Sequence, residues 1–519
     1  MIRKIRIASQ CLFLIVFLWL FLQTESKGAN ELGYPVKIFL DADPLVSITT
    51  VLSSRALDHI PYLAIAVILA TVFLGRFFCG WLCPLGALNN LTGSLKRWRF
   101  RAAPRIWYRL KYYVLIFLLV SSLFSLQLAG VLDPLSLLIR SFSLSVYPLI
   151  SYTASATFDA FYGLNVPVFV NVTEAIYSFL KKVILPFQQP FFLQSVFVGL
   201  LFFLILGLNL VERRFWCKYL CPSGALLGLL SRYAVLKRTV SEGCDSCGAC
   251  GAVCQGNAVP DEKKGWKNTE CVLCMNCDDL CPKNAVHFGF TGKASAASMD
   301  LGKRRVIGSI LAGVIAVPLL RISPITKTSY GDPKLIRPPG SLDEKAFLSR
   351  CVKCGECMKV CITNGLQPTL LEAGLEGIWS PVLVPRIGYC EFRCTLCGQV
   401  CPTGAIRKLD MEEKAKIRIG LAMIDKGRCL PYAHATSCIV CEEVCPTPQK
   451  AIWFEKVIAR NRDGKELVLK QPRVDLELCI GCGICEAKCP VIGQPAIYVT
   501  SVGESRSKDN QLLIPEVSK

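Results

Sequence analysis

Apolar runs of membrane-spanning length alternate with polar, cysteine-rich stretches along the chain. Four runs are long enough to cross the hydrocarbon core of a bilayer, which takes about 20 residues; they lie at 7–23, 60–78, 112–131 and 192–211. A fifth, shorter run occupies 306–320. The pattern predicts an α-helical membrane domain with about five transmembrane helices. A cleaved signal peptide is the alternative for the first run, but no clear small-residue cleavage site follows it.

The basic residues indicate how these helices are oriented. Segment 96–111 carries seven basic residues and no acid, and segment 212–238 carries six against Glu212 alone, whereas the loops at 24–59 and 132–190 are mixed in sign. Basic loops stay in the cytoplasm. We therefore expect the N-terminus and residues 212–302 in the cytoplasm, and the C-terminal domain in the periplasm of a bacterial cell. The net charge of +20 is placed beside apolar runs, which favours a membrane over a nucleic acid as partner.

Lys303, Arg304 and Arg305 precede the fifth run, so it should point outward, either as a plain anchor or as an internal twin-arginine export signal. The predicted domain order is a membrane domain at 1–239, a cytoplasmic two-cluster domain at 240–290, a transmembrane anchor at 303–321, a linker at 322–344, a periplasmic four-cluster domain at 345–500 and a tail at 501–519.

Cysteine spacing identifies the chemistry of the polar stretches. Two sets follow the membrane domain: Cys244, Cys247, Cys250 and Cys254, then Cys271, Cys274, Cys277 and Cys281. This C-x2-C-x2-C-x3-C spacing is that of α+β bacterial ferredoxin-like domains, in which the fourth cysteine of each set binds the other [4Fe–4S] cluster. Zinc is the alternative, but zinc sites favour two separated C-x2-C pairs.

Four further sets fill the C-terminal region. They are Cys351, Cys354, Cys357 and Cys361; Cys390, Cys394, Cys397 and Cys401; Cys429, Cys438, Cys441 and Cys445; and Cys479, Cys482, Cys485 and Cys489. The spacing departs from the standard at the start of the second set (C-x3-C) and of the third (C-x8-C), so Cys429 stands apart from its set. The fourth cysteines could be exchanged between neighbouring sets or between nested sets, and spacing does not decide. The six sets predict six [4Fe–4S] clusters.

Two further cysteine pairs belong to an internal repeat inside the membrane domain. Cys79 and Cys83 lie in FCGWLCPLGAL, and Cys217 and Cys221 lie in FWCKYLCPSGAL. The two cysteines of a pair share a helix face, and both pairs should lie at the cytoplasmic ends of inward-running helices. They could bind an iron–sulfur centre or another metal such as Cu(I), form a redox-active dithiol, or be structural.

The sequence gives little support for haem, for flavin or for a catalytic site. The histidines are His59, His287 and His434, there is no C-x-x-C-H motif, and no flavin-attachment motif is present, so neither haem nor flavin is expected. No catalytic acid, base or nucleophile can be named. Arg76, Trp81 and Tyr219 could form a quinone pocket, although an arginine beside aromatic residues is more often a headgroup anchor.

The chain resembles a fusion of two known proteins. The CGWLCP and CKYLCP repeat followed by a two-cluster ferredoxin resembles the membrane quinol dehydrogenase subunit of periplasmic nitrate reductase systems. The RPPG stretch and the CLPYAHATSCIVCEEVCP run resemble the four-cluster periplasmic ferredoxin subunit of those systems and the methylamine-utilisation ferredoxin. The membrane core is also similar to a nitrous oxide reductase maturation regulator and to a copper-reducing oxidase assembly factor.

The resemblance implies that electrons pass from the quinone pool to a periplasmic redox protein, a cytochrome or a reductase, and that the four C-terminal clusters are paired in the nested way. We therefore expect a membrane-bound iron–sulfur electron-transfer protein that oxidises quinol or takes electrons from a cytoplasmic donor. The alternative is a metal (copper) reductase or a maturation factor for a periplasmic or membrane metalloenzyme.

Overall fold

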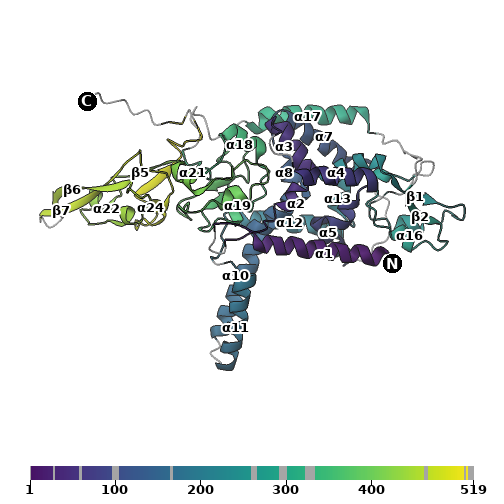
Figure 1. Ribbon diagram of the computed structural model, residues 1–519, viewed down its shortest axis with the longest axis horizontal. Helices are drawn as coiled ribbons and strands as arrows, with labels where there is room; N and C mark the ends of the chain where they lie inside the picture. Colours follow the sequence, from purple (N-terminus) through teal and green to yellow (C-terminus); the bar gives the residue numbers. More distant parts are fainter. Residues whose placement is uncertain are drawn as a thin grey trace.

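The computed structural model describes residues 2–26, 30–57, 61–95, 105–163, 167–186, 188–256, 258, 266–290, 301–321, 333–460, 466–507 and 510–511. A helical region forms the centre of the molecule (Figure 1). The small sheet of the two-cluster module lies at one of its ends, beside the N-terminus, and the C-terminal domain lies at the other. The two cysteine-rich parts are therefore separated by the length of the helical region.

The helical region is built from helices of very unequal length. They are α1 (Ile2–Gln23), α2 (Ile38–Asp41), α3 (Pro44–Ser54), α4 (Tyr62–Leu74), the π-helical η1 (Phe78–Leu82), α5 (Pro84–Ser94), α6 (Arg105–Tyr108), α7 (Leu110–Leu123), α8 (Ala129–Leu132), α9 (Pro134–Ser141), the π-helical η2 (Phe142–Val146), α10 (Tyr147–Gly163), α11 (Pro167–Val183), α12 (Ser195–Gly207), η3 (Leu208–Leu210), α13 (Phe215–Tyr219), α14 (Pro222–Leu230), η4 (Ser231–Tyr233) and α17 (Lys303–Arg321).

Among the described residues, two helices are long and apolar enough to cross a membrane, α1 and the continuous segment Pro134–Gly163. The runs at 60–78, 112–131 and 192–211 correspond to shorter apolar helices, and α17, which covers the run 306–320, is not one of the two candidate spans. The expected five-helix membrane domain is therefore not confirmed. The cause is local: α4 has 13 residues, about 20 Å at 1.5 Å per residue, because Gly75 ends it with a φ of 86°. The second long segment lies within the stretch 132–190, where the sequence indicated a loop.

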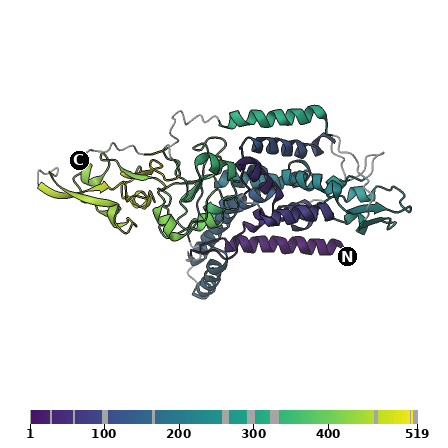
Figure 2. The same cartoon turned by 45° about the horizontal axis from the view of Figure 1, so that its top comes forward.

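Helices α7 and α17 lie side by side (Figure 2). The contact is close because Gly313 of α17 has no side chain: a Cβ there would stand 3.0 Å from Val120. At the far end of α17, Arg321 donates to the carbonyls of Phe124 and Ser125 and pairs with Glu376 of the C-terminal domain. Helix α17 therefore runs between the two ends of the helical region.

Helices α10 and α11 leave the helical region as a projecting hairpin (Figure 1). Asp133 begins the preceding helix α9 by accepting hydrogen bonds from the amides of Leu135 and Ser136. The π-helical turn η2 then leads into α10. The base of this hairpin consequently lies at the junction between the helical region and the C-terminal domain.

The two-cluster module is a short antiparallel sheet with cysteine loops on top. Its elements are β1 (Leu236–Val240), α15 (Ala249–Ala252), η5 (Asn268–Glu270), α16 (Asn276–Asp279) and β2 (Val286–Phe290). Strand β1 pairs with β2 in a register that places Leu236 opposite Phe290. The sheet brings the start of the first cysteine set close to the end of the second.

The C-terminal domain is made of short helices and three two-stranded antiparallel sheets. Its elements are α18 (Glu344–Arg350), α19 (Glu356–Lys359), β3 (Leu366–Pro368), β4 (Pro381–Leu383), α20 (Leu396–Gln399), α21 (Met411–Lys416), β5 (Leu421–Ile424), α22 (Leu430–Ala433), α23 (Val440–Glu443), β6 (Ile452–Arg460), β7 (Glu466–Val474), α24 (Ile484–Ala487) and β8 (Ile497–Thr500). Strand β3 pairs with β4, β5 with β8, and β6 with β7.

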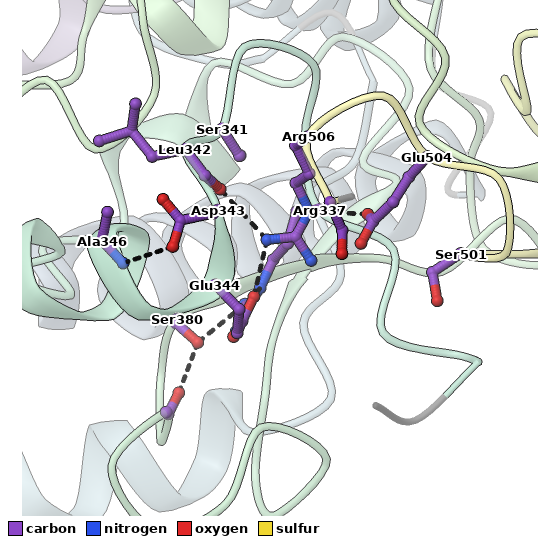
Figure 3. A network of polar contacts seen from close by, with 12 residues as sticks. Arg337, Ser341, Leu342, Asp343, Glu344, Ala346, Ser380, Ser501, Glu504 and Arg506 are labelled. Carbon is purple, nitrogen blue, oxygen red and sulfur yellow. Dashed lines mark hydrogen bonds and ion pairs between the residues drawn. The ribbon is translucent and has the colours of Figure 1, made fainter. Parts of the chain in front are cut away.

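Residues on both sides of this domain pack into it. Arg337 is 1% exposed and pairs with Glu344, which also pairs with Arg506 (Figure 3). Ile336 bridges to Leu383 and is also buried. The packed unit therefore includes part of the stretch that the sequence indicated as a linker and part of the expected tail.

Candidate iron–sulfur sites

The four standard cysteine sets share one backbone device. The residue after the second cysteine has a positive φ in each: Gly248, Met275, Gly355 and Gly483, with values of 77°, 53°, 84° and 83°. A short helix begins there and carries the third cysteine. In the two sets whose first spacing departs from the standard, the equivalent residues Thr395 and Ile439 have φ of −122° and −126°. The departures in spacing thus accompany a different loop conformation.

In the C-terminal domain the sixteen cysteines line four cavities, four to each. The Cys351 cavity is lined by Cys351, Cys354, Cys357 and Cys401; the Cys390 cavity by Cys361, Cys390, Cys394 and Cys397; the Cys429 cavity by Cys429, Cys438, Cys441 and Cys489; and the Cys479 cavity by Cys445, Cys479, Cys482 and Cys485. The four cavities are alike in size. Each presents four sulfur ligands, which is the donor set of a [4Fe–4S] cluster.

The cysteines that line each cavity show whether the fourth cysteine is exchanged between neighbouring sets or between nested sets. The first set exchanges with the second, and the third with the fourth. The nested arrangement that the resemblance implied is therefore wrong for this chain. Strand pairing explains the result for the second half, because β5 and β8 tie the region before Cys429 to the region after Cys489. Cys429 lies in the cavity with its own set in spite of its unusual spacing.

Hydrogen bonds reach several of the lining sulfurs. The amides of Ile406, Ala422 and Ala496 donate to Cys401, Cys479 and Cys489 at 3.4, 3.5 and 3.4 Å. A threonine two residues after the last cysteine lies beside the sulfur in three sets, at 3.2 Å for Thr447 and Cys445. Such donors stabilise negative charge on sulfur and are one means of setting a cluster's potential. The cavities therefore fit an anionic sulfur-ligated group.

In the two-cluster module the structure places Cys254 with the second set. Burial, together with the neighbouring Cys274 and Cys254, raises the pKa of Cys271 and Cys277 to about 12. Cys281 accepts a hydrogen bond from the amide of Ala285 at 3.3 Å. Ser241 donates to the carbonyl of Ala285 at 2.9 Å, which brings the Cys281 turn toward Cys244.

The two cysteine pairs of the helical region share the same local geometry. Cys83 precedes α5 and Cys221 precedes α14, each as the cap residue before a proline at the first helical position. Each sulfur accepts a hydrogen bond from the glycine amide three residues on, Gly86 at 3.4 Å and Gly224 at 3.2 Å. Cys217 accepts one from the Asn89 side chain at 3.6 Å. The Cys-Pro-x-Gly repeat therefore aims both sulfurs at helix N-termini, which favour negative charge.

The two pairs converge, and two buried arginines join them. Cys79, Cys83 and Cys221 each lie within electrostatic reach of Cys217. Arg214 crosses from the second motif to the first, where it donates to the carbonyls of Cys79 and Gly86 at 3.1 and 3.2 Å.

Arg76 makes the reciprocal approach: a Cβ on Gly224 would stand 2.9 Å from Arg76 Nη2. Each arginine stands three residues before its own motif's first cysteine. Sequence reasoning missed Arg214, although extending the repeat by three residues would have included it.

The arginines leave buried positive charge beside the thiols. Arg76 and Arg214 are 2% and 1% exposed. Glu270 pairs with Arg76 and with Lys111, but in the described part of the chain no carboxylate pairs with Arg214, whose Nε and Nη1 are buried without a partner. A buried charge is costly unless an opposite charge compensates it. An anionic centre held by the four thiolates would supply that compensation.

Backbone contacts connect this thiol site to the two-cluster module. A Cβ on Gly80, between Cys79 and Cys83, would stand 2.1 Å from the carbonyl oxygen of Val272, which lies between Cys271 and Cys274. Arg6 of α1 also reaches Gln255 and Asn276 of the module, at 3.3 Å each.

A similar contact joins the helical region to the C-terminal domain. A Cβ on Gly130 would stand 2.0 Å from the carbonyl oxygen of Val352, between Cys351 and Cys354. Arg140 donates to the carbonyls of Gly130 and Lys353, and Lys353 donates to the carbonyl of Gln127 at 2.9 Å. One buried apolar cluster contains Cys221 and Cys354, with Cys79 and Cys83 packed against it.

The structure gives the hydrogen-bond partners of the three residues suggested for a quinone pocket. Trp81 donates to the carbonyl of Leu273 at 3.0 Å, and Arg76 to that of Thr269 at 3.1 Å. Tyr219 donates to Glu212. Trp81 and Arg76 therefore hold the two-cluster module in place.

The structure also bears on two other points from the sequence, the ligands of a single metal ion and the positions of the histidines. In the described part of the chain, no three His, Cys, Asp or Glu side chains lie together as ligands of a single metal ion. His287 lies in β2 and His434 follows α22, whereas His59 is outside the described residues.

Family models for 4Fe–4S binding domains match parts of the chain. A model described as a 4Fe–4S binding domain matches residues 60–102 and 193–241, which hold the two Cys-x3-Cys-Pro motifs. A second model with the same description matches residues 472–491. The expected ferredoxin-type [4Fe–4S] domains are thus confirmed. No solved structure matches the chain.

Curated relatives cover different shares of the chain. YccM of Escherichia coli, named for electron transport, is 30% identical over 224 residues, 42% of this chain and 52% of that protein. The ferredoxin-type protein NapG of E. coli is 36% identical over 141 residues, 26% of this chain and 60% of that protein. The ferredoxin-type protein NapH of Haemophilus influenzae is 24% identical over 274 residues, 49% of this chain and 79% of that protein. The chain thus spans only about half of YccM and 60% of NapG. The ferredoxin-type protein MauM of Methylorubrum extorquens is a relative as well.

Proposed function

We propose that this chain, an iron–sulfur electron-transport protein related to the ferredoxin-type proteins NapG, NapH and MauM, relays electrons across the bacterial cytoplasmic membrane. Electrons enter from quinol, or from a cytoplasmic donor, and leave to a periplasmic redox protein. The relay uses six [4Fe–4S] clusters held by the ferredoxin-type cysteines, and a seventh centre at the thiol site formed by Cys79, Cys83, Cys217 and Cys221.

The arrangement of the two cysteine-rich parts supports a path across the membrane. They lie at opposite ends of the helical region, and α17 runs from one end to the other (Figure 1). Lys303 to Arg305 begin α17 at the end of the helical region that carries the two-cluster module, where Lys237 of β1 also lies. Under the positive-inside rule this end faces the cytoplasm and the C-terminal domain faces the periplasm.

The observation that carries the proposal is the series of contacts between cysteine loops. The Cys271–Cys274 loop touches the Cys79–Cys83 loop at Gly80, and the Cys351–Cys354 loop touches the helical region at Gly130. The thiol site lies between the two contacts, in the same apolar cluster as Cys354. A centre there would divide one long electron transfer into shorter steps.

The thiol site suits a redox centre that gains and loses one electron. The helix N-termini at Cys83 and Cys221 and the guanidinium groups of Arg76 and Arg214 all stabilise negative charge on sulfur. An iron–sulfur cluster bound here would supply the one-electron chemistry, and the arginines would keep its reduced form accessible at a less negative potential.

The iron content of the purified full-length protein tests the centre. Six clusters bring about 24 irons per chain and seven bring about 28, with equal acid-labile sulfide. We expect the Cys79→Ser/Cys217→Ser double variant to lose about four irons relative to the wild type. Cys11→Ser is the matched control, because Cys11 is an exposed cysteine of α1 outside every set. Equal iron in the double variant and the control would exclude the seventh centre.

Electron transfer is tested separately in sealed liposomes. A quinol analogue in the bilayer should reduce a dye outside the C-terminal domain only when the protein is present. The double variant at Cys79 and Cys217 should slow transfer from the two-cluster module to that dye and leave dithionite reduction of the C-terminal clusters unchanged. Transfer at the wild-type rate would contradict a path through the thiol site.

A further inference from the structure

A large cavity lies where the helical region meets the C-terminal domain. Its volume is about 730 Å³, within the range of sites that bind organic cofactors and ligands. The walls come from the end of α1, from η2 and α10, from the end of α11, and from the loops around Cys361 and Tyr389. We call it the Tyr147 cavity.

One wall of the Tyr147 cavity is also a wall of the Cys390 cavity. Val360, Cys361, Ile362, Thr363, Tyr389 and Glu391 line both. A molecule in the Tyr147 cavity is therefore separated from a candidate cluster by a single layer of residues. That position suits an electron donor better than a purely structural ligand.

The cavity also offers polar groups that could bind a hydroxylated ring and take its protons. The Tyr147 hydroxyl lies 2.9 Å from Glu25 Oε2. Ser143 is 1% exposed, and its hydroxyl lines the cavity without a hydrogen-bond partner. Lys359 Nζ is held by the carbonyls of Phe21 and Thr24 at the end of α1, so its position is fixed.

The surroundings suit a ligand that arrives through lipid. Large apolar side chains are exposed on the hairpin beside the cavity: Leu149 and Ile150 on α10, and Phe179 and Val183 on α11. Val183 also lines the cavity itself. Exposed apolar side chains on an amphipathic element indicate contact with a membrane interface.

We infer that the Tyr147 cavity binds a lipid-soluble quinol at the outer end of the helical region and delivers its electrons directly to the C-terminal domain. This inference rests on the proposed function, in which quinol is a donor. It places the site at the opposite end of the helical region from Arg76, Trp81 and Tyr219.

The oxidation of quinol balances with Tyr147, Glu25 and the proposed clusters as acceptors of its protons and electrons. Quinol loses two electrons and two protons to become quinone. Clusters held in the Cys390 and Cys351 cavities would each accept one of the two electrons. One ring hydroxyl gives its proton to Tyr147 while Tyr147 gives its own to Glu25; after release to the outside water the same route serves the second proton.

The test uses the full-length protein in lipid nanodiscs with menadiol as donor, followed by the loss of visible cluster absorbance. Tyr147→Phe and Glu25→Gln should each slow menadiol oxidation about tenfold or more, as expected for a lost proton acceptor. Ser143→Trp should block it by filling the cavity. Tyr152→Phe and Glu174→Gln are matched controls on the exposed hairpin, and they should react at the wild-type rate. Dithionite should reduce every variant equally, and iron content should not change.

The outcomes separate the two proposals. If the wild type oxidises menadiol and the three cavity variants keep its rate, the site is wrong and the quinol donor stands. If the wild type does not oxidise menadiol, the quinol donor and this site both fail. An azidoquinone label should map to residues 143–147 or 359–364. A label at 76–81 or 219, or an anionic phospholipid that fills the cavity and is not displaced by menadiol, would overturn the inference.

Discussion

Gly80 lies at the closest approach between the helical region and the two-cluster module. Any side chain there would meet the carbonyl oxygen of Val272, since a Cβ would stand 2.1 Å from it. Backbone on both sides leaves little room to adjust. The contact therefore depends on glycine for its size and not for its flexibility.

Gly80→Ala should consequently loosen the two-cluster module. We expect a cost of about 1–3 kcal/mol, the range for overpacking a close contact. Hydrogen exchange in residues 268–274 measures it. Gly207→Ala is the control, because nothing lies within 4 Å of a Cβ there, and alanine within a helix is neutral or slightly stabilising. Equal exchange in both variants would show that the module is not held at Gly80.

Glu344 is held ionised by two arginines (Figure 3). Burial alone would raise the pKa of its carboxyl, but Arg337 and Arg506 outweigh burial and lower the pKa to about 2. Arg337 also stacks on Phe347, 4.7 Å from its ring centroid. The carboxylate thereby joins α18 to residues on both sides of the domain.

A lowered carboxyl pKa has a definite consequence for stability. Its contribution is complete above about pH 4.5, the ordinary value, and is lost as the pH falls toward 2. Glu344→Gln should remove it at neutral pH, at a cost of about 1–2 kcal/mol, reduced from the usual range for charged hydrogen bonds because the side chain is 35% exposed. Hydrogen exchange of residues 337–350 between pH 6 and 3.5 should show a shallower pH dependence than in the exposed control Glu412→Gln. Identical pH profiles would contradict the ion-pair assignment.

At the scale of the elements, the cysteine sets could be predicted but their pairing could not. Spacing alone gave each set and its first three cysteines, because three closely spaced sulfurs must face one another. The fourth cysteine depends on which sets lie together, and that depends on the packing of β5 against β8. Nothing in the spacing encodes that packing.

The lengths of the apolar helices were overestimated for a related reason. Hydropathy continues through the run 60–78, but Gly75 adopts a positive φ of 86°, which ends α4 at Leu74. Residues 78–82 then form the separate π-helical turn that carries Cys79. The glycine was a visible signal for a helix end. In contrast, the buried role of Arg214 depends on a contact with the other motif, which only the folded chain reveals.

Neighbouring exchange of the fourth cysteine predicts which substitutions affect the same cluster. Cys401→Ala should change the same electron paramagnetic resonance signal as Cys351→Ala, and Cys489→Ala the same signal as Cys429→Ala. Nested exchange would instead give Cys489→Ala and Cys351→Ala a shared signal. Cys11→Ala should leave the spectrum unchanged. The comparison distinguishes the two pairings because each pairing predicts a different grouping of these four cysteine variants by the signal that they change.

At the scale of the whole molecule, the function depends on which side of the membrane each end occupies. The two-cluster module and the C-terminal domain lie at opposite ends of the helical region, with α17 alongside α7 connecting them (Figure 2). If the helical region is embedded in the bilayer, α17 must carry the chain across it. A path for electrons across the membrane then requires that α17 crosses outward.

Fusions to alkaline phosphatase, which is active only outside the cytoplasm, test this crossing. A fusion after Gly302, before α17, should be inactive, and a fusion after Lys519 should be active. A fluorescent protein that matures only in the cytoplasm should give the reverse pattern. Replacing Lys303, Arg304 and Arg305 with glutamine should reduce the activity of the Lys519 fusion, because these charges orient α17. An inactive fusion after Lys519 in the wild type would place all the ferredoxin-type clusters on one side, and electrons would then have no need to cross the membrane.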